Sequence, residues 1–173
     1  MNLRNPYPLI VSLLTSILLL TGCLESLEGY KNEIENMQVP RLMIESRGID
    51  YGGGSSNQVT LPISGTTIKL EREPVVAEYD IMNVEMVKVE LGLAIMIQVS
   101  DKGARELYRR SVTNLGSRIV LTVNGLAIGA RRLSGTIEDG QFFTFVEIPE
   151  EELSQFVLDL KASIIELQTH YKY

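Results

Sequence analysis

Apolar residues recur along this chain with two different periods. Short runs in which apolar and polar side chains alternate predict strands, whereas spacings of three and four residues predict amphipathic helices. Because short turns separate most of the short runs, we expect them to pair as antiparallel strands. The runs place strands at residues 41–47, 58–63, 66–73, 86–91, 93–100, 118–123, 126–133, 135–138 and 141–148.

Several of the turns between these runs contain glycine as the second residue of a two-residue hairpin turn. The pairs Asn124-Gly125 and Asp139-Gly140 each separate two predicted strands, which is a strong signal for a hairpin. Ser64-Gly65 separates another pair of strands, and Pro62 assigns the first of them to a sheet edge because proline lacks the ladder N–H. The glycine-rich segment 48–57 is expected to be a loop. It lacks the Gly-Lys-Ser/Thr ending of a phosphate-binding loop and leads into a strand, so it does not predict a phosphate site.

The clearest helix signal covers residues 101–115. Ser100 is a good N-cap, Asp101 favours the positive end of the helix dipole, and Gly116 is placed to end the helix in the left-handed conformation. The apolar residues recur at three, four, seven, eight and eleven positions, so we expect one stripe that packs on the sheet. The stripe comprises Ala104, Leu107, Tyr108, Ser111, Val112 and Leu115.

The two faces of this helix are expected to differ in exposure. Leu107 and Val112 lie in the apolar stripe and are predicted to be buried. Arg105 and Arg109 lie outside the stripe and are predicted to face solvent.

A second helix signal begins at Pro149, which suits the first position of a helix, with Glu150–Glu152 in the first turn. Two amphipathic helices on one face of a mostly antiparallel sheet give a two-layer α+β domain. That fold class is our prediction. The inner face of the second helix comprises Leu153, Phe156, Val157, Leu160, Ile164 and Leu167.

The N-terminal segment has the features of a targeting signal. Arg4 precedes an uncharged apolar run, Pro8–Leu20, which is shorter than the roughly 20 residues that a membrane-spanning helix needs. The lone cysteine, Cys23, follows in Leu-Thr-Gly-Cys, which resembles the lipobox of bacterial lipoproteins. The resemblance implies a lipid thioether on Cys23 and cleavage after Gly22. The alternative is a free cysteine inside an uncleaved anchor.

This interpretation divides the chain into a signal peptide (1–22), a tether (23–40) and a folded domain (41–173). The lipid bilayer is then a partner through the acylated cysteine, because two or three acyl chains anchor a protein stably. The protein is expected on the exoplasmic side of the envelope. Leu24, in place of the aspartate that retains lipoproteins in the inner membrane, favours the outer membrane facing the periplasm in a Gram-negative cell.

The charge narrows the range of partners. The chain has a net charge of −6. Nucleic acid and anionic membrane surfaces attract basic patches, so an acidic protein is not expected to bind either of them.

Three segments between Lys69 and Leu160 form a pattern by their order and spacing. They are LEREPVVAEYDI (70–81), VELGLAIMIQVSDKGARELYRRSVTNLGSRIVLTVNGLAIGAR (89–131) and FVEIPEEELSQFVLDL (145–160). Together they resemble the head subdomain of the first exoplasmic domain (P1) of SecD, an accessory subunit of the protein-export motor. The resemblance implies an α+β fold and an exported binding module.

Two features depart from the SecD pattern. The family often has a small-Ala-Pro step where this chain has Gly129-Ala130-Arg131, and without the proline the outgoing strand is free to pair differently. SecD also carries membrane helices whose charged residues couple to protons, and no apolar run after the signal peptide matches them here. The resemblance therefore implies a binding module and no motor activity.

The residue types that usually carry catalysis are sparse. His170 is the single histidine and is close to the C-terminus, so a histidine-based triad or metal site is not expected. We predict no catalytic residue, no cofactor and no metal site, so the protein is not expected to be an enzyme. Three groups of side chains have an alternative, functional interpretation. Neighbouring carboxylates would act together as a pair, and they occur at Glu71/Glu73, Glu138/Asp139 and Glu150–Glu152. The doublets Arg109/Arg110 and Arg131/Arg132 would contact lipid phosphates, and Met82, Met86 and Met96 would line an apolar groove.

Two functions fit these observations. The first is an anchored lipoprotein whose SecD-head-like domain binds proteins, such as exported chains or a component of the translocon or of envelope assembly. The second is a lipoprotein that binds a small ligand or lipid in a pocket between the sheet and the helices. An open apolar groove or an exposed strand edge would favour the first, and an enclosed cavity would favour the second.

Overall fold

The structure is a computed structural model that describes residues 37–48 and 57–170. The predicted signal peptide, Cys23, most of the predicted tether and most of the 48–57 loop lie outside these residues. Within them, no helix is long and apolar enough to cross a membrane.

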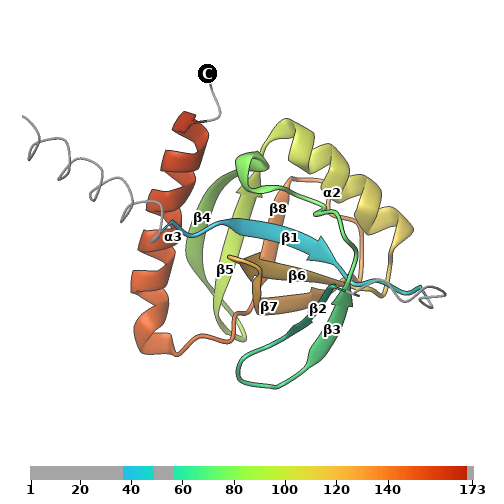
Figure 1. Ribbon diagram of the computed structural model, residues 1–173, viewed down its shortest axis with the longest axis horizontal. Coiled ribbons are helices and arrows are strands. Elements are labelled where there is room, and N and C mark those ends of the chain that lie inside the picture. The colour runs from blue at the N-terminus through green and yellow to red at the C-terminus, as the bar shows by residue number, and fades with distance from the viewer. Residues whose placement is uncertain (1–36, 49–56, 171–173) are drawn as a thin grey trace, which may run out of the picture. The chain divides into compact units, whose positions relative to one another are not determined.

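Within the described residues the strands form three antiparallel sheets, which confirms the predicted α+β class, although the sequence did not separate the strands into different sheets (Figure 1). The sheet β1-β6-β7 consists of Pro40–Ile44, Arg118–Val123 and Leu126–Arg132. The sheet β4-β5-β8 consists of Ile81–Val89, Gly92–Val99 and Gln141–Thr144, and the hairpin β2-β3 consists of Asn57–Thr60 and Thr67–Leu70.

The main core lies between the two larger sheets and both helices. One face of β1 and β6 contributes Leu42 and Leu121, and β5 contributes Ile97. The helices are α2 (Asp101–Thr113) and α3 (Glu150–His170), and a 3₁₀ turn, η1 (Glu78–Asp80), precedes β4. The other face of β1-β6-β7 packs against the β2-β3 hairpin in a second cluster. That cluster comprises Met43, Leu61, Ile68, Leu70, Val120 and Ala127.

Helix α3 has the predicted inner face and runs along β4 (Figure 1). Its apolar side chains Leu153, Val157, Leu160 and Ile164 enter the main core, and Phe156 packs partly against it. Near its C-terminal end the Gln168 side chain donates to the Ile81 carbonyl at 2.9 Å.

Helix α2 begins as predicted, because the Ser100 hydroxyl accepts a hydrogen bond from the Gly103 N–H at 3.1 Å. Gly116 has a positive φ of 83°, as predicted, but it is not the helix cap. The helix ends at Thr113 with Asn114 as its C-cap, and the Gly116 N–H donates to the Leu133 carbonyl instead. Leu107 is fully buried and the Arg105 and Arg109 side chains are exposed, as expected.

The prediction that Val112 is buried was wrong, since 44% of this residue is exposed. Contact with the core follows a narrower line at four-residue spacing, Gly103, Leu107 and Ser111. Gly103 lets the first turn approach Val99, and the Ser111 hydroxyl near the last turn accepts from the Ile137 N–H at 3.0 Å. Because the contacts at Gly103 and Ser111 fix the orientation of the helix, the remaining residues of the predicted stripe face solvent. That exposed half comprises Tyr108, Val112 and Leu115.

The glycine turns gave one further correction. Asn124-Gly125 and Ser64-Gly65 join paired strands as predicted. The expected hairpin around Asp139-Gly140 does not form, because residues 135–138 are not a strand and β8 pairs with β5 instead. The Gly140 carbonyl accepts from the Val99 N–H at 3.1 Å, which sets this register.

Candidate functional site

The sheet β4-β5-β8 has a face that the core does not use, polar around the pair Asn83↔Gln98 and apolar towards the β4–β5 turn. Side chains alternate between the faces of a sheet, and the pairs Val87↔Ala94 and Met96↔Phe143 place these four residues together. Val89 and Phe145 follow two positions further along their segments. We call these six residues the outer face, and none of them belongs to either hydrophobic cluster of the described residues. Val89 and Phe145 are 37% and 44% exposed.

A pocket of about 510 Å³ opens on this face where β7 comes near β8. Of its lining residues, Ala94 is buried, whereas Leu91, in the β4–β5 turn, is 86% exposed. The pocket is therefore open to solvent and mainly apolar. Its lining comprises Val89, Glu90, Leu91, Ala94, Ala130, Arg131, Phe143, Thr144 and Phe145.

The pocket exists because two sheets approach at one point and then diverge. Gly129 of β7 forms an isolated antiparallel bridge with Val146, beside a hydrogen bond from the Glu147 N–H to the Ile128 carbonyl at 2.7 Å. A Cβ at Gly129 would overlap the Phe145 carbonyl oxygen, so the close approach requires glycine. Beyond the bridge, β7 stays paired with β6 and β8 stays paired with β5, which leaves a wedge between them.

Arg131 spans this wedge. Its backbone pairs with Ile119 of β6, so the outgoing strand continues through the position where SecD often has proline. Its side chain crosses to β8, where Nη1 donates to the Phe143 carbonyl at 3.2 Å. The Arg131 side chain thus satisfies the Phe143 carbonyl, which would otherwise be free to accept from a neighbouring strand.

Glu147 connects the pocket region to the β2-β3 hairpin. Its Oε2 atom accepts from the N–H groups of Ile63 and Ser64 at 2.7 and 2.8 Å. Partial burial acts to raise the pKa of Glu147, but these hydrogen bonds outweigh it and leave the pKa below its ordinary value. The ionised carboxylate therefore fixes the hairpin turn beside the segment that follows β8.

Ion pairs elsewhere join the strands to each other and to the turns. Arg118 of β6 binds Glu45 through two nitrogens, at 2.6 and 3.0 Å, and these hydrogen bonds hold the pKa of Glu45 below its ordinary value although partial burial opposes them. Arg41 binds Glu78 in the same manner, at 2.7 and 3.1 Å, and lowers the pKa of Glu78. Neither pair lines the pocket, so we assign them to stability.

We expect stability to decrease in acid because of these pairs. Carboxyl groups with a lowered folded-state pKa stabilise the fold above the ordinary value near 4.5, and this contribution is lost as the pH falls through the lowered values. Glu45→Gln is expected to cost about 1 kcal/mol at neutral pH and less at about pH 3. Urea denaturation at both pH values measures this. An equal cost at both would contradict the assignment.

The other residues singled out from the sequence are dispersed. Glu71 pairs with Arg110 at 3.0 Å and Arg109 with Glu106 at 2.5 Å, and no group of three or more potential ligands within the described residues is arranged to hold a metal. His170 ends α3, and its side chain lies outside the described part. The other carboxylates, Glu73, Glu138, Asp139 and Glu150–Glu152, are exposed.

The three methionines do not form one groove. Met96 lies on the outer face, whereas Met82 and Met86 of β4 are 48% and 39% exposed and contact side chains of α3. Sequence reasoning missed Phe143 and Phe145 as site residues, although the run Phe-Phe-Thr-Phe places aromatic side chains on both faces of a strand.

No protein-family model and no curated protein matches this sequence. The fold is similar to solved structures of SecDF. One, SecDF in a super-membrane-facing form, has a TM-score of 0.56 and 17% identity over 73% of this chain and 19% of that chain. Another, described as a membrane component that enhances protein export, has a TM-score of 0.55 and 15% identity over 77% of this chain and 67% of that chain.

The chain therefore spans about a fifth of the first SecDF structure and two thirds of the second. At such low identity the likeness establishes the fold alone. The resemblance to SecD expected from the sequence is confirmed at that level. The assignment to the P1 head and the lipid anchor at Cys23 stay predictions.

Proposed function

We propose that this chain is a lipid-anchored envelope protein whose SecD-head-like domain binds extended, apolar polypeptide segments at the outer face. The observation that carries the proposal is the open apolar pocket beside a strand edge. Side chains such as Leu91 and Phe145 are available to a partner without any rearrangement of the core. SecDF is described as enhancing protein export, which supports exported chains as the partner class.

Binding of an unfolded segment tests the proposal. The probe is a fluorescein-labelled decapeptide of alternating valine and threonine with a lysine at each end. We expect the full chain, held in lipid nanodiscs, to raise its fluorescence anisotropy saturably. Phe145→Ser should weaken binding about tenfold, because an apolar contact of this size is worth about 1.5 kcal/mol.

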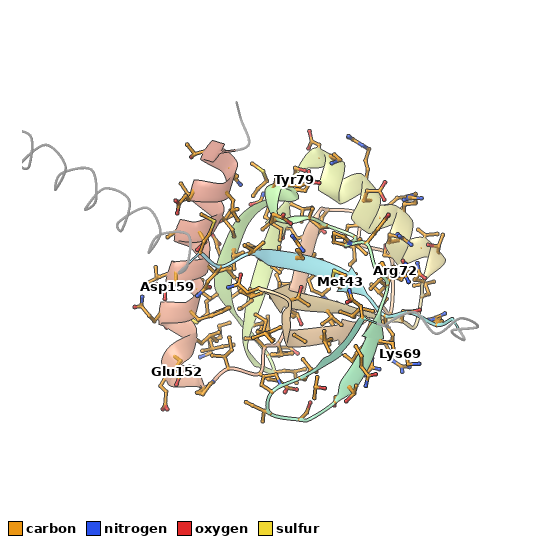
Figure 2. All side chains as sticks on the ribbon, in the orientation of Figure 1. Met43, Lys69, Arg72, Tyr79, Glu152 and Asp159 are labelled. Carbon is orange, nitrogen blue, oxygen red and sulfur yellow. The ribbon has the colours of Figure 1, made fainter. Side chains whose placement is uncertain are left out.

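The matched control for Phe145 is Leu158→Ser. Leu158 is also apolar and 61% exposed, but it belongs to α3. The neighbouring Asp159 points away from the domain (Figure 2). Equal loss of affinity in both variants, or no binding by the parent, would overturn the proposed site.

The anchor is tested at Cys23, which lies outside the described residues. Cys23→Ser should leave unprocessed precursor or release soluble protein, because the lipid thioether needs the sulfur atom. Membrane fractionation and metabolic labelling with a fatty acid measure this. A variant that fractionates and migrates like the parent would refute the lipoprotein assignment, including the proposed location in the outer membrane of a Gram-negative cell.

The proposed role involves no catalysis. The carboxylates with a lowered pKa are engaged in ion pairs or hold a turn, as described above, whereas a proton-transfer catalyst near neutral pH usually uses a histidine or a carboxylate whose pKa is raised. We therefore expect His170→Ala to bind the decapeptide as the parent does. This variant is preferable to removal of the last residues of α3, because Gln168 holds the start of β4.

A small apolar ligand or a lipid is the second candidate occupant. A pocket of about 510 Å³ lies within the range of ligand sites, roughly 300–1,000 Å³. Its open mouth favours the polypeptide. Competition between the decapeptide and a fluorescent fatty acid separates the two candidates, since displacement by the fatty acid at lower concentration would favour the ligand.

A further inference from the structure

On the edge of β8 that faces the wedge, the Gln141 N–H already donates to the Asp139 carboxylate at 3.0 Å, so the backbone groups that a partner can use are those of Phe143. The Gly140 carbonyl is turned towards β5, where it accepts from the Val99 N–H at 3.1 Å. Because N–H and C=O groups alternate in direction along a strand, Phe142 and Thr144 also face β5, and Phe143 faces away. Within the described residues, the Phe143 carbonyl accepts from Arg131 Nη1. Among the described strands, no ladder joins β8 to β7, and the isolated Gly129–Val146 bridge lies beyond the end of β8.

We propose that a bound polypeptide adds as a strand to the edge of β8, inside the wedge between β8 and β7, and that Arg131 is the group it displaces. This inference rests on the proposed function and specifies how the segment is held. The incoming strand donates an N–H to the Phe143 carbonyl and accepts from the Phe143 N–H. Its apolar side chains then lie over the outer face.

The wedge favours an extended backbone over other occupants. A sheet edge matches a neutral chain in which donors and acceptors alternate, and no lipid or nucleotide provides that pattern. The pocket lining contains one acidic side chain, Glu90, and one basic side chain, Arg131. These charges compensate each other, so the lining favours neither an anionic nor a cationic ligand. The Gly129–Val146 bridge already joins the two sheets at the apex of the wedge, and an added strand continues that junction.

Arg131 acts as a gate in this arrangement. Its guanidinium holds the acceptor of Phe143 when no partner is present, and the side chain must leave before a strand can pair. Removal of this competitor should strengthen binding by about three- to tenfold, the equivalent of one hydrogen bond. A residue that bound the peptide directly would produce the opposite effect.

Two peptides test the mode of binding. The first is the valine–threonine decapeptide, and the second has the same side chains but carries N-methyl groups on alternate backbone nitrogens, so one edge cannot donate. The methylated peptide is made in two versions, with the N-methyl groups on the odd or on the even residues. All three peptides are titrated against the full chain in lipid nanodiscs. We expect one methylated register to bind at least about tenfold more weakly than the parent peptide.

Two further measurements use the protein itself. Arg131→Ala should bind the unmodified decapeptide about three- to tenfold more tightly, with Arg109→Ala as the control for loss of an exposed arginine. Amide hydrogen exchange at Phe143 should slow about tenfold at saturating peptide. Circular dichroism and the exchange of core amides confirm that each variant is folded.

The outcomes separate the two proposals. If both methylated registers bind as tightly as the parent peptide, strand addition is wrong and the proposed function stands. Weaker binding by Arg131→Ala overturns the gate and makes Arg131 a ligand of the peptide. If no peptide binds at all, the proposed function fails, and strand addition fails with it.

Discussion

Leu107→Ala is expected to lower the free energy of unfolding by about 2–5 kcal/mol. Leu107 is fully buried in the main core, and Ala104 of the same helix packs partly against that core. Truncation removes apolar contacts and leaves a cavity that the surrounding strands fill only in part. Chemical denaturation followed by circular dichroism measures the change.

Val112→Ala is the matched control for Leu107. Both residues are apolar and belong to the stripe predicted on the same helix, but Val112 is 44% exposed. We expect its truncation to cost within about 0.5 kcal/mol, as Arg105→Ala should. If Val112→Ala costs as much as Leu107→Ala, the helix presents the wider stripe to the core and the described orientation of α2 is incorrect.

Gly129→Ala is expected to destabilise the fold by about 1–3 kcal/mol. An added Cβ overlaps the Phe145 carbonyl and comes within 3.1 Å of a Val146 methyl group. The overlap is with backbone, so neither partner can move aside without separating β7 from the segment after β8. The bridge at the apex of the wedge would break, and the pocket would widen.

Gly135→Ala provides the comparison for this substitution. No atom lies within 4 Å of a Cβ at Gly135, so we expect a change within about 0.5 kcal/mol. Urea denaturation of both variants gives the two costs. A result in which Gly129→Ala is as stable as Gly135→Ala would show that β7 and Phe145 are not in close contact.

The local signals in the sequence predicted much of the fold. Asn124 has a φ of 51° and Gly125 a φ of 81°, as an Asn-Gly hairpin turn requires, because that pair tolerates the left-handed region better than other residues do. Ser100 caps α2 through its own hydroxyl. These features depend on neighbours a few residues apart, so the sequence contains all of the relevant information.

The same kind of signal failed where a distant segment competed for the strand. The chain bends at Asp139-Gly140, with Gly140 at a φ of 67°. The Asp139 carboxylate accepts from the Gln141 N–H at 3.0 Å. Nevertheless β8, the strand that follows this bend, pairs with β5. In the segment before the bend, the Ile137 N–H donates a hydrogen bond to the Ser111 hydroxyl of α2. Hydrophobic pattern and turn type do not specify which partner a strand will find.

The candidate site was the least predictable part. The sequence indicated that Arg131 stands where SecD often has proline, and it gave the aromatic run of β8, but it did not bring them together. Arg131 and Phe143 meet because two sheets built from distant strands approach at Gly129 and then diverge. A pocket produced by such a divergence leaves no periodic signal in either strand.

By itself, the sequence determined the α+β class, most strand and helix positions, the inner face of α3 and the likeness to SecD, because each depends on local period or on the order of motifs along the chain. Tertiary structure alone decided the division into three sheets, the narrow contact line of α2, the partner of β8 and the open pocket beside Arg131. Those features depend on which distant segments pack together. Packing contacts form between residues that are close in space but far apart in the sequence, so local sequence patterns do not reveal them.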